Sequence, residues 1–183
     1  MIFTTVYFFL RRVAGWKQKK HPLLYNALHI GDQLVNVGGT TVRNSSEAQK
    51  VIRNSTCLYI DFIIKRVPYG NVFALQRQSE GQSLGIVQEG NTAEIKEILP
   101  NSIAARQGLT SKTPSPYGLS LTTWFLTEIN GRPLNLFFKD NEVKDRLNAV
   151  GKEISVLVQP KDFIKQIKRQ LKSMTGYKDY IVQ

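Results

Sequence analysis

The tetrapeptide "SLGI", residues 83–86, places a glycine between two large apolar residues at the start of a β-like run. It is preceded by "EGQ" (80–82) and followed by "VQEGNTAEIKEIL" (87–99). A glycine at such a position indicates a bend, a bulge or a close approach by another part of the backbone. One interpretation is a bulge with Leu84 and Ile86 in the core. The other is a loop whose backbone amides face a ligand.

The sequence around this tetrapeptide predicts a small β-rich module. Alternating apolar residues indicate strands, Asn-Gly indicates a tight turn, and a closing glycine or proline marks the end of an element. The predicted elements are a strand at 71–77, strands across 86–99, a helical turn at 102–108, a strand–turn–strand unit at 125–134, a helix at 139–150 and a strand at 152–160. The stretch 110–123, with two prolines, is predicted to be a linker-like insertion.

A shorter copy of the same pattern comes first in the chain. "HIGDQLVNVGGTTV" (29–42) predicts two strands joined by a glycine turn, and "LYIDFIIKRV" (58–67) predicts a later strand. Between them, "SSEAQKVIRNS" (45–55) predicts a helix with Ser45 or Ser46 as its N-cap. Repetition at roughly 90 residues indicates two copies of one module.

The positive charge of the chain is concentrated at its two ends. The net charge is +11, of which residues 1–20 carry +5 and residues 161–183 carry +4, while residues 21–160 carry only +2. A surface that reads nucleic acid would instead place a continuous basic patch on the module itself. Nucleic-acid binding is therefore a distant third among the functions considered, and no nucleic-acid partner is expected.

The sequence contains no strong signal for secretion, for a membrane-spanning segment or for a catalytic site. The single cysteine, Cys57, cannot form an internal disulfide, and the apolar run at 1–10 is too short to span a bilayer and lacks the flanks of a signal peptide. The chain has two histidines, His21 and His29, and shows no carboxylate pair, Cys–His arrangement, metal-ligand cluster or phosphate loop. We expect a cytoplasmic protein that is not an enzyme and needs no cofactor.

Several of these motifs together resemble the PDZ domain family. "HIGDQLVNVGGTTVRNSSEAQKVI" (29–52) resembles the closing half of a PDZ domain, and residues 71–160 resemble a whole one. Ser83–Ile86 stands where the family has its Gly-Leu-Gly-Phe carboxylate-binding loop, while "ILPNSIAARQGL" (98–109) and "LTEINGRPL" (126–134) match later parts of the domain. The tandem arrangement is similar to the C-terminal PDZ pair of the Mint adaptors.

The resemblance implies a mainly β fold with two helices per module, a PDZ-like partly open β-barrel or sandwich, with the second copy complete and the first partial. The domains expected are an atypical basic segment at 1–26, a partial PDZ-like repeat at 27–68, a PDZ domain at 69–160 and a basic amphipathic tail at 161–183.

The function implied by the resemblance is that of a non-catalytic scaffold or adaptor. PDZ domains bind the extended C-terminus of a partner as an added strand, between the second strand and the second helix. The partners expected are C-terminal tails of other proteins, for example of membrane receptors or channels. The peptide-binding residues implied are Ser83, Leu84, Gly85, Ile86, Val87, Lys139, Asp140, Val143 and Leu147.

Lys139 or Asp140 stands where many family members have a histidine that reads a serine or threonine of the ligand. Either residue argues against that selectivity. A contact with a charged ligand side chain and a solvated helix face are both open for this position.

The first copy has too little sequence in front of it to be complete. Only 30 residues precede Gly31, and none resembles the carboxylate-binding loop, so Ser45, Gln49 and Ile52 would face a groove that lacks its second strand. Residues 1–10 either supply an edge strand or are an unrelated beginning, from alternative splicing or a faulty gene model. We expect exposed apolar surface on 58–67 and no independent ligand site.

The tail "KDFIKQIKRQLKSM" (161–174) predicts a basic amphipathic helix. Its apolar stripe contains Phe163, Ile167, Leu171 and Met174, and its basic residues are Lys161, Lys165, Lys168, Arg169 and Lys172. Such a helix can lie on an anionic membrane, as a peripheral or phosphoinositide-associated protein would, or present a calmodulin-type target. It can equally pack on the second module with its lysines in solvent.

Overall fold

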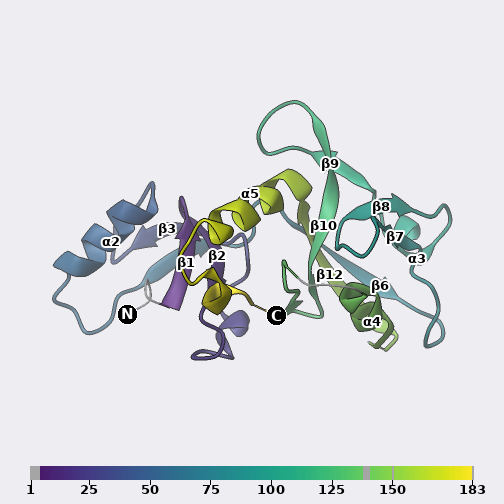
Figure 1. The fold of residues 1–183 in the computed structure, drawn as a ribbon, viewed down its shortest axis with the longest axis horizontal. Coiled ribbons are helices and arrows are strands. Elements are labelled where there is room, and N and C mark those ends of the chain that lie inside the picture. The colour runs from purple at the N-terminus through teal and green to yellow at the C-terminus, as the bar shows by residue number, and fades with distance from the viewer. Residues whose placement is uncertain (1–4, 138–140, 150, 183) are drawn as a thin grey trace. The chain divides into compact units, whose positions relative to one another are not determined.

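The computed structural model describes residues 5–137, 141–149 and 151–182. Two compact units form the chain: residues 1–68 together with Arg169–Val182, and Tyr69–Lys168 (Figure 1). Both units are mainly β with a few short helices, as the sequence predicts.

The first unit contains one antiparallel sheet in the order β1-β2-β3-β4, with β5 on the other edge of β3. Its strands are β1 (Val6–Phe9), β2 (Arg12–Trp16), β3 (Gln33–Val37), β4 (Thr40–Thr41) and β5 (Phe62–Lys65). Its helical segments are η1 (Leu24–Asn26), α2 (Ser45–Asn54) and η2 (Tyr177–Tyr180). Residues 6–16 therefore belong to the sheet of the first unit, in which β1 is an edge strand among the described residues.

Two details of the first unit differ from the sequence-based expectation. Asn44, and not Ser45 or Ser46, caps α2, because its side chain accepts the Glu47 backbone N–H at 2.9 Å. The Glu47 carboxylate in turn accepts the Arg43 N–H, one residue before the cap, at 2.7 Å. The last strand is also shorter than 58–67, since β5 begins at Phe62 and the residues before it are irregular.

The second unit contains a sheet in the order β11-β10-β12-β6, with β9 paired to β10, and a separate pair β7-β8. Its strands are β6 (Asn71–Gln76), β7 (Ile86–Gln88), β8 (Ile95–Ile98), β9 (Lys112–Pro114), β10 (Leu121–Ile129), β11 (Arg132–Pro133) and β12 (Glu153–Pro160). Its helices are α3 (Ile103–Arg106) and α4 (Glu142–Ala149), and α5 (Lys161–Lys172) begins in this unit. The core is apolar, with Leu75, Ile95, Leu126, Ile129 and Val156 fully buried.

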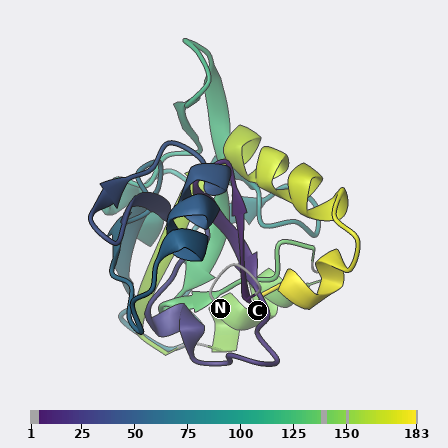
Figure 2. The same cartoon turned by 90° about the vertical axis from the view of Figure 1, so that its left-hand side faces the viewer.

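The stretch 110–123 is not a linker. It forms the β9–β10 hairpin, in which Leu121 pairs with Pro114 and the Ser115 N–H donates to the Ser120 carbonyl at 2.9 Å. The hairpin extends away from the body of the second unit (Figures 1 and 2). The two prolines are compatible with it because proline is tolerated in edge strands and turns.

The apolar stripe of α5 is buried. Phe163, Ile164, Ile167 and Leu171 are all almost inaccessible, whereas Met174 is half-buried. Phe163 packs edge-to-face on Tyr69 with ring centroids 5.4 Å apart. The stripe is therefore part of the protein interior, which is the packing alternative of the sequence analysis.

Candidate functional site

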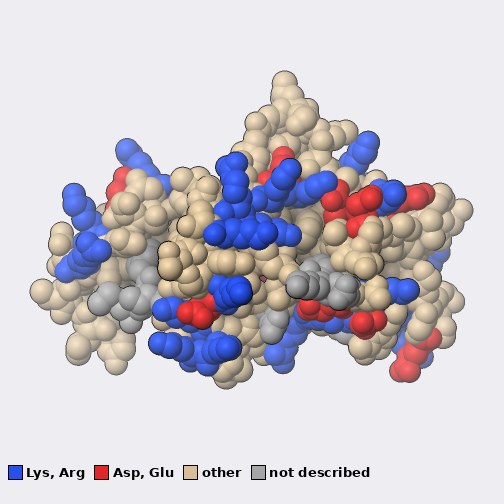
Figure 3. Space-filling view, viewed as in Figure 1, with Lys and Arg blue, Asp and Glu red and all other residues tan. Residues whose placement is uncertain are grey.

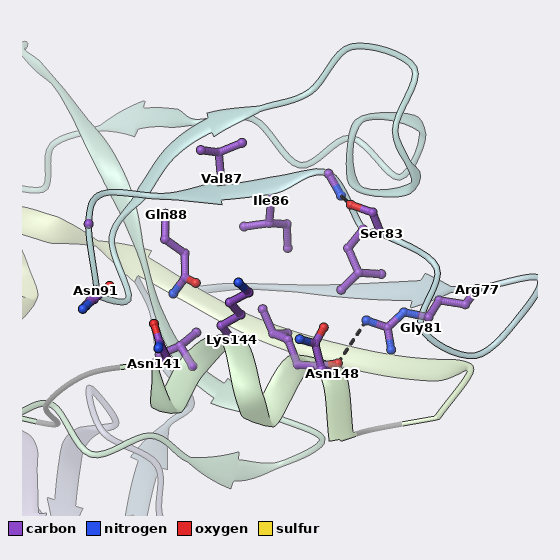
Figure 4. Close-up of a pocket in the computed structure, with 15 residues that line it drawn as sticks. Arg77, Gly81, Ser83, Ile86, Val87, Gln88, Asn91, Asn141, Lys144 and Asn148 are labelled. Carbon is purple, nitrogen blue, oxygen red and sulfur yellow. Dashed lines mark hydrogen bonds between the residues drawn. The ribbon is translucent and has the colours of Figure 1, made fainter.

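A groove in the second unit runs between β7 and α4, with a cavity volume of about 460 Å³ (Figure 4). The turn before β7 closes one end of the groove. Seven of the residues singled out in the sequence line it: Ser83, Leu84, Gly85, Ile86, Val87, Val143 and Leu147. The structure thus brings together side chains that are separated by about 60 residues in the chain.

Gly85 is required for this turn for two physical reasons. Its φ is +78°, a conformation that side chains disfavour, and an added Cβ would lie 2.1 Å from the Ser102 Cβ. Ser102 cannot easily move away, because its hydroxyl caps α3 by accepting the Ala105 N–H at 3.2 Å. The glycine is thus explained by the close approach of another segment, the one that contains Ser102. The same turn forms the end of the groove.

The backbone of β7 presents an open edge to the groove. The Gly85 carbonyl accepts the Leu99 N–H at 2.9 Å, so residue 85 faces β8. Because backbone groups alternate along an antiparallel strand, the N–H and C=O of Ile86 point to the opposite edge. Within the described residues β7 pairs only with β8, so its free edge faces α4.

The walls of the groove near the turn are apolar. Val143 and Leu147 lie one helical turn apart on α4 and are buried, and Leu84 is buried opposite them. The i, i+4 spacing places both α4 side chains on the same helix face. This end of the groove can therefore accommodate an aliphatic side chain.

Arg77 lines the groove and was missed by the sequence analysis. Its side chain is 3% exposed, and its guanidinium donates to the carbonyls of Gln82 at 2.7 Å, Leu147 at 3.0 Å and Gly151 at 3.2 Å. It thereby ties the turn to the C-terminal end of α4, where a cation is also favoured by the helix dipole. The only sequence signal is a charged residue directly after a strand and just before a glycine-rich turn.

Polar residues also line the groove on the α4 side. Lys139 and Asp140 lie outside the described residues, so their role stays a prediction. The polar residues described on this side are Asn141, just before α4, and Lys144 and Asn148 on α4. Lys144 extends from α4 toward β7, where Gln88 extends from the strand (Figure 4). The sequence could not locate these residues because the exact start of the helix relative to the groove was open.

Arg146 holds α4 to the neighbouring strand β11 from the side away from the groove. Its guanidinium donates to the Pro133 carbonyl at 2.8 Å and to the Arg132 carbonyl at 3.3 Å. Burial lowers the pKa of Arg146, and the nearby Glu142 carboxylate partly opposes this effect. The normal pKa of arginine lies far above 7, so the side chain stays charged at neutral pH.

The basic residues of α5 are distributed between contacts and solvent. Lys161 forms an ion pair with Glu94 at 2.6 Å, and the Lys168 ammonium lies 5.4 Å from the ring centroids of both Phe125 and Phe137. Lys165, Arg169 and Lys172 are exposed. Lys and Arg side chains gather over α5 (Figure 3). Any lipid contact by this helix would depend on its charges, because its apolar stripe is buried.

The described residues show neither a membrane-spanning helix nor a metal-binding cluster. No helix there has both the length and the apolar character that crossing a bilayer requires. The same residues contain no group of three or more His, Cys, Asp or Glu side chains arranged to hold a metal ion.

Comparisons with known proteins find similarity among solved structures. No family model matches the chain, and no curated protein matches it. Among solved structures, it is similar to INAD PDZ45 in complex with NG2 peptide, with 16% identity over 82% of this chain and 75% of that chain and a TM-score of 0.32. It is also similar to INAD PDZ45 in complex with NORPA CC-PBM, with 16% identity, coverages of 82% and 77% and a TM-score of 0.29. These values are low, and the function proposed below rests on the groove itself.

Proposed function

We propose that the second unit binds the free C-terminus of a partner protein as a strand added to the open edge of β7. The observation that carries this proposal is the free β7 edge facing α4 across a groove that the Ser83–Ile86 turn closes. Strand addition uses unpaired backbone groups for affinity and side-chain pockets for selectivity. Ile86 supplies those backbone groups.

The closed end of the groove would bind the terminal carboxylate. Successive N–H groups at a turn with positive φ can form an anion-binding concavity, and Gly85 in this turn has a positive φ. We expect the backbone amides of Leu84, Gly85 and Ile86 to donate to the carboxylate in this way. The Gly85 amide donates to the Ser83 hydroxyl at 3.2 Å, a long hydrogen bond that a carboxylate would replace. The apolar walls favour an aliphatic last residue in the ligand.

Lys144 would select an acidic side chain further up the ligand. It lies on the groove face of α4, Asn141 lines the groove just before the helix, and Gln88 and Asn91 line the opposite side. Amide side chains can hydrogen-bond a carboxylate, and the ammonium adds charge complementarity. Such a contact with a charged ligand side chain is of the kind that the sequence analysis considered for Lys139 or Asp140, which lie outside the described residues.

The protein would act as a non-catalytic adaptor that holds the C-terminal tail of a receptor, a channel or another protein. The similarity to the Mint PDZ pair stays a prediction.

The test is a titration of the full chain with a fluorescent peptide that ends in valine, carries an upstream glutamate and has a free carboxylate. We expect micromolar affinity, about −7 to −8 kcal/mol, because only a few residues occupy the groove. The same peptide with an amidated C-terminus should bind at least about tenfold more weakly, since a charge-assisted hydrogen-bonding site loses its anion. Equal affinity of the two peptides would refute the proposal.

A further inference from the structure

The strand β5 has one neighbour where the equivalent strand of the second unit has two. β12 follows α4 and pairs with β10 on one edge and with β6 on the other. β5 follows α2 in the same way, but within the described part of the chain it pairs only with β3. One edge of β5 therefore lacks the antiparallel strand that β6 provides for β12.

The residues along β5 and just before it are unusually apolar for an exposed edge. Ile63 is 58% exposed, and Leu58 and Tyr59 are 95% and 90% exposed. Asp61, Ile63 and Lys65 share the exposed face, whereas Phe62 and Ile64 on the other face are half-buried. An open edge with apolar side chains is a template for pairing with another strand.

The direction of the backbone groups determines which residues can pair. The Asp61 carbonyl accepts the Gly38 N–H at 2.8 Å, so residue 61 faces β3. By the alternation of an antiparallel strand, the N–H and C=O groups of Phe62 and Ile64 face the free edge. A strand added at this edge must place its own outward-facing residues opposite these two.

We propose that two copies of this chain pair antiparallel along β5, with a two-fold axis through Ile63. In this register Phe62 lies opposite the partner's Ile64, and the two exchange backbone hydrogen bonds. Asp61 lies opposite the partner's Lys65, and Ile63 packs against the partner's Ile63. The segment "DFIIK" (61–65) is thus complementary to itself in reverse, as a two-fold interface requires.

The charges favour a second copy over an unrelated strand. Opposite charges directly across an antiparallel pair stabilise it, and like charges destabilise it. If the partner strand shifted by one residue, residues whose backbone groups face the free edge would lie opposite residues whose backbone groups face β3. If it shifted by two residues, neither Asp61 would lie opposite a Lys65. Only the central register satisfies the backbone and both charge pairs together. This inference involves the first unit and does not depend on the peptide groove of the second.

The experiment is sedimentation equilibrium of the full chain over a range of about 1 to 200 μM, an interval suited to weak dimers. We expect a reversible monomer–dimer equilibrium. Asp61→Lys should raise the dimer dissociation constant about tenfold, because two attractive cross-strand pairs become repulsive, and Lys65→Asp should act similarly. The double variant Asp61→Lys/Lys65→Asp restores both pairs and should return the constant to within about threefold of the original.

A matched control is Lys50→Asp, which changes an exposed charge on α2 in the same unit and should leave the dissociation constant unchanged. Circular dichroism of each variant verifies its fold. A wild-type chain that stays monomeric over the whole range overturns the proposal. So does a dimer that Asp61→Lys does not weaken, or one that the double variant does not restore.

Discussion

Gly85 lies so close to Ser102 that a Cβ on residue 85 would stand 2.1 Å from the Ser102 Cβ. Ser102 is the N-cap of α3, and the Ala104 N–H donates to the neighbouring Leu84 carbonyl at 3.0 Å. The turn that closes the groove is therefore held against α3 before any ligand binds. Backbone amides arranged in advance lose little conformational entropy on binding.

Gly85→Ala should lower both the free energy of unfolding and peptide affinity. The added methyl group meets Ser102 in a backbone conformation that alanine disfavours, and we expect a loss of about 2 kcal/mol or more. Urea denaturation measures it. Gly118→Ala is the matched control, because nothing lies within 4 Å of its Cβ position, and it should change stability by less than about 0.5 kcal/mol. Equal effects of the two substitutions would contradict this account of the turn.

Arg77→Met should destabilise the second unit and weaken peptide binding. The substitution removes the donors of three carbonyl groups, and hydrogen bonds from a charged group contribute about 1.5 to 3 kcal/mol each. Since these bonds share one side chain, we expect a combined loss of about 3 kcal/mol in urea denaturation. Arg77→Lys keeps the charge but not the planar fork, and should recover only part of the stability. If Arg77→Lys restored the full unfolding free energy, the positive charge alone, and not the three hydrogen bonds of the guanidinium, would account for the stabilisation.

Lys144→Glu should reverse the preference for an acidic residue in the ligand. Two peptides that differ only by Glu or Lys at one upstream position measure this preference in a fluorescence titration. Because Lys144 is exposed, we expect a change of about threefold to fivefold in relative affinity. Lys152→Glu makes the same charge change outside the groove lining and should leave the ratio as it is. An unchanged ratio in Lys144→Glu would remove this residue from the specificity determinants.

Ile167→Ala should cost about 2 to 5 kcal/mol of unfolding free energy, because Ile167 is fully buried in the α5 stripe. Lys165→Ala, on the exposed face two residues earlier, should be nearly neutral. Thermal and urea unfolding of both variants measure the difference. If the stripe instead served a membrane, Ile167→Ala would leave stability intact and reduce co-sedimentation with phosphatidylserine vesicles.

Residues 1–68 expressed alone should not unfold cooperatively. The first unit also contains Arg169–Val182, in which Leu171 and Val182 are buried, and Tyr180 lies against the β1–β2 hairpin with its ring 6.2 Å from that of Tyr7. Without this segment the sheet exposes apolar surface, which favours aggregation. NMR dispersion and a urea titration test this. A sharp transition in the fragment would mean that the C-terminal segment contributes little to the unit.

The sequence alone predicted the features that depend on local patterns. Alternation predicted strands at β6, β10 and β12, and the glycine of "SLGI" predicted a bend or a close approach. These predictions succeeded because residue periodicity and glycine conformation act over a few residues. The same reasoning placed the N-cap of α2 one or two residues too late, because serine and asparagine are equally good caps and only the geometry distinguishes them. The groove residues Val143 and Leu147 were implied by the resemblance to the PDZ family and not by their spacing.

Only the tertiary structure decided the features that join distant segments. Arg77 became a groove residue because its acceptors Leu147 and Gly151 lie about 70 residues later in the chain. The stretch 110–123 has the composition of a linker, but it forms a hairpin because Lys112–Pro114 pair with the first residues of β10. The α5 stripe could equally have faced lipid or protein, since both environments favour the same apolar spacing. Which surface it covers depends on the complementary apolar residues that the rest of the fold brings to it, and no local pattern in the helix records them.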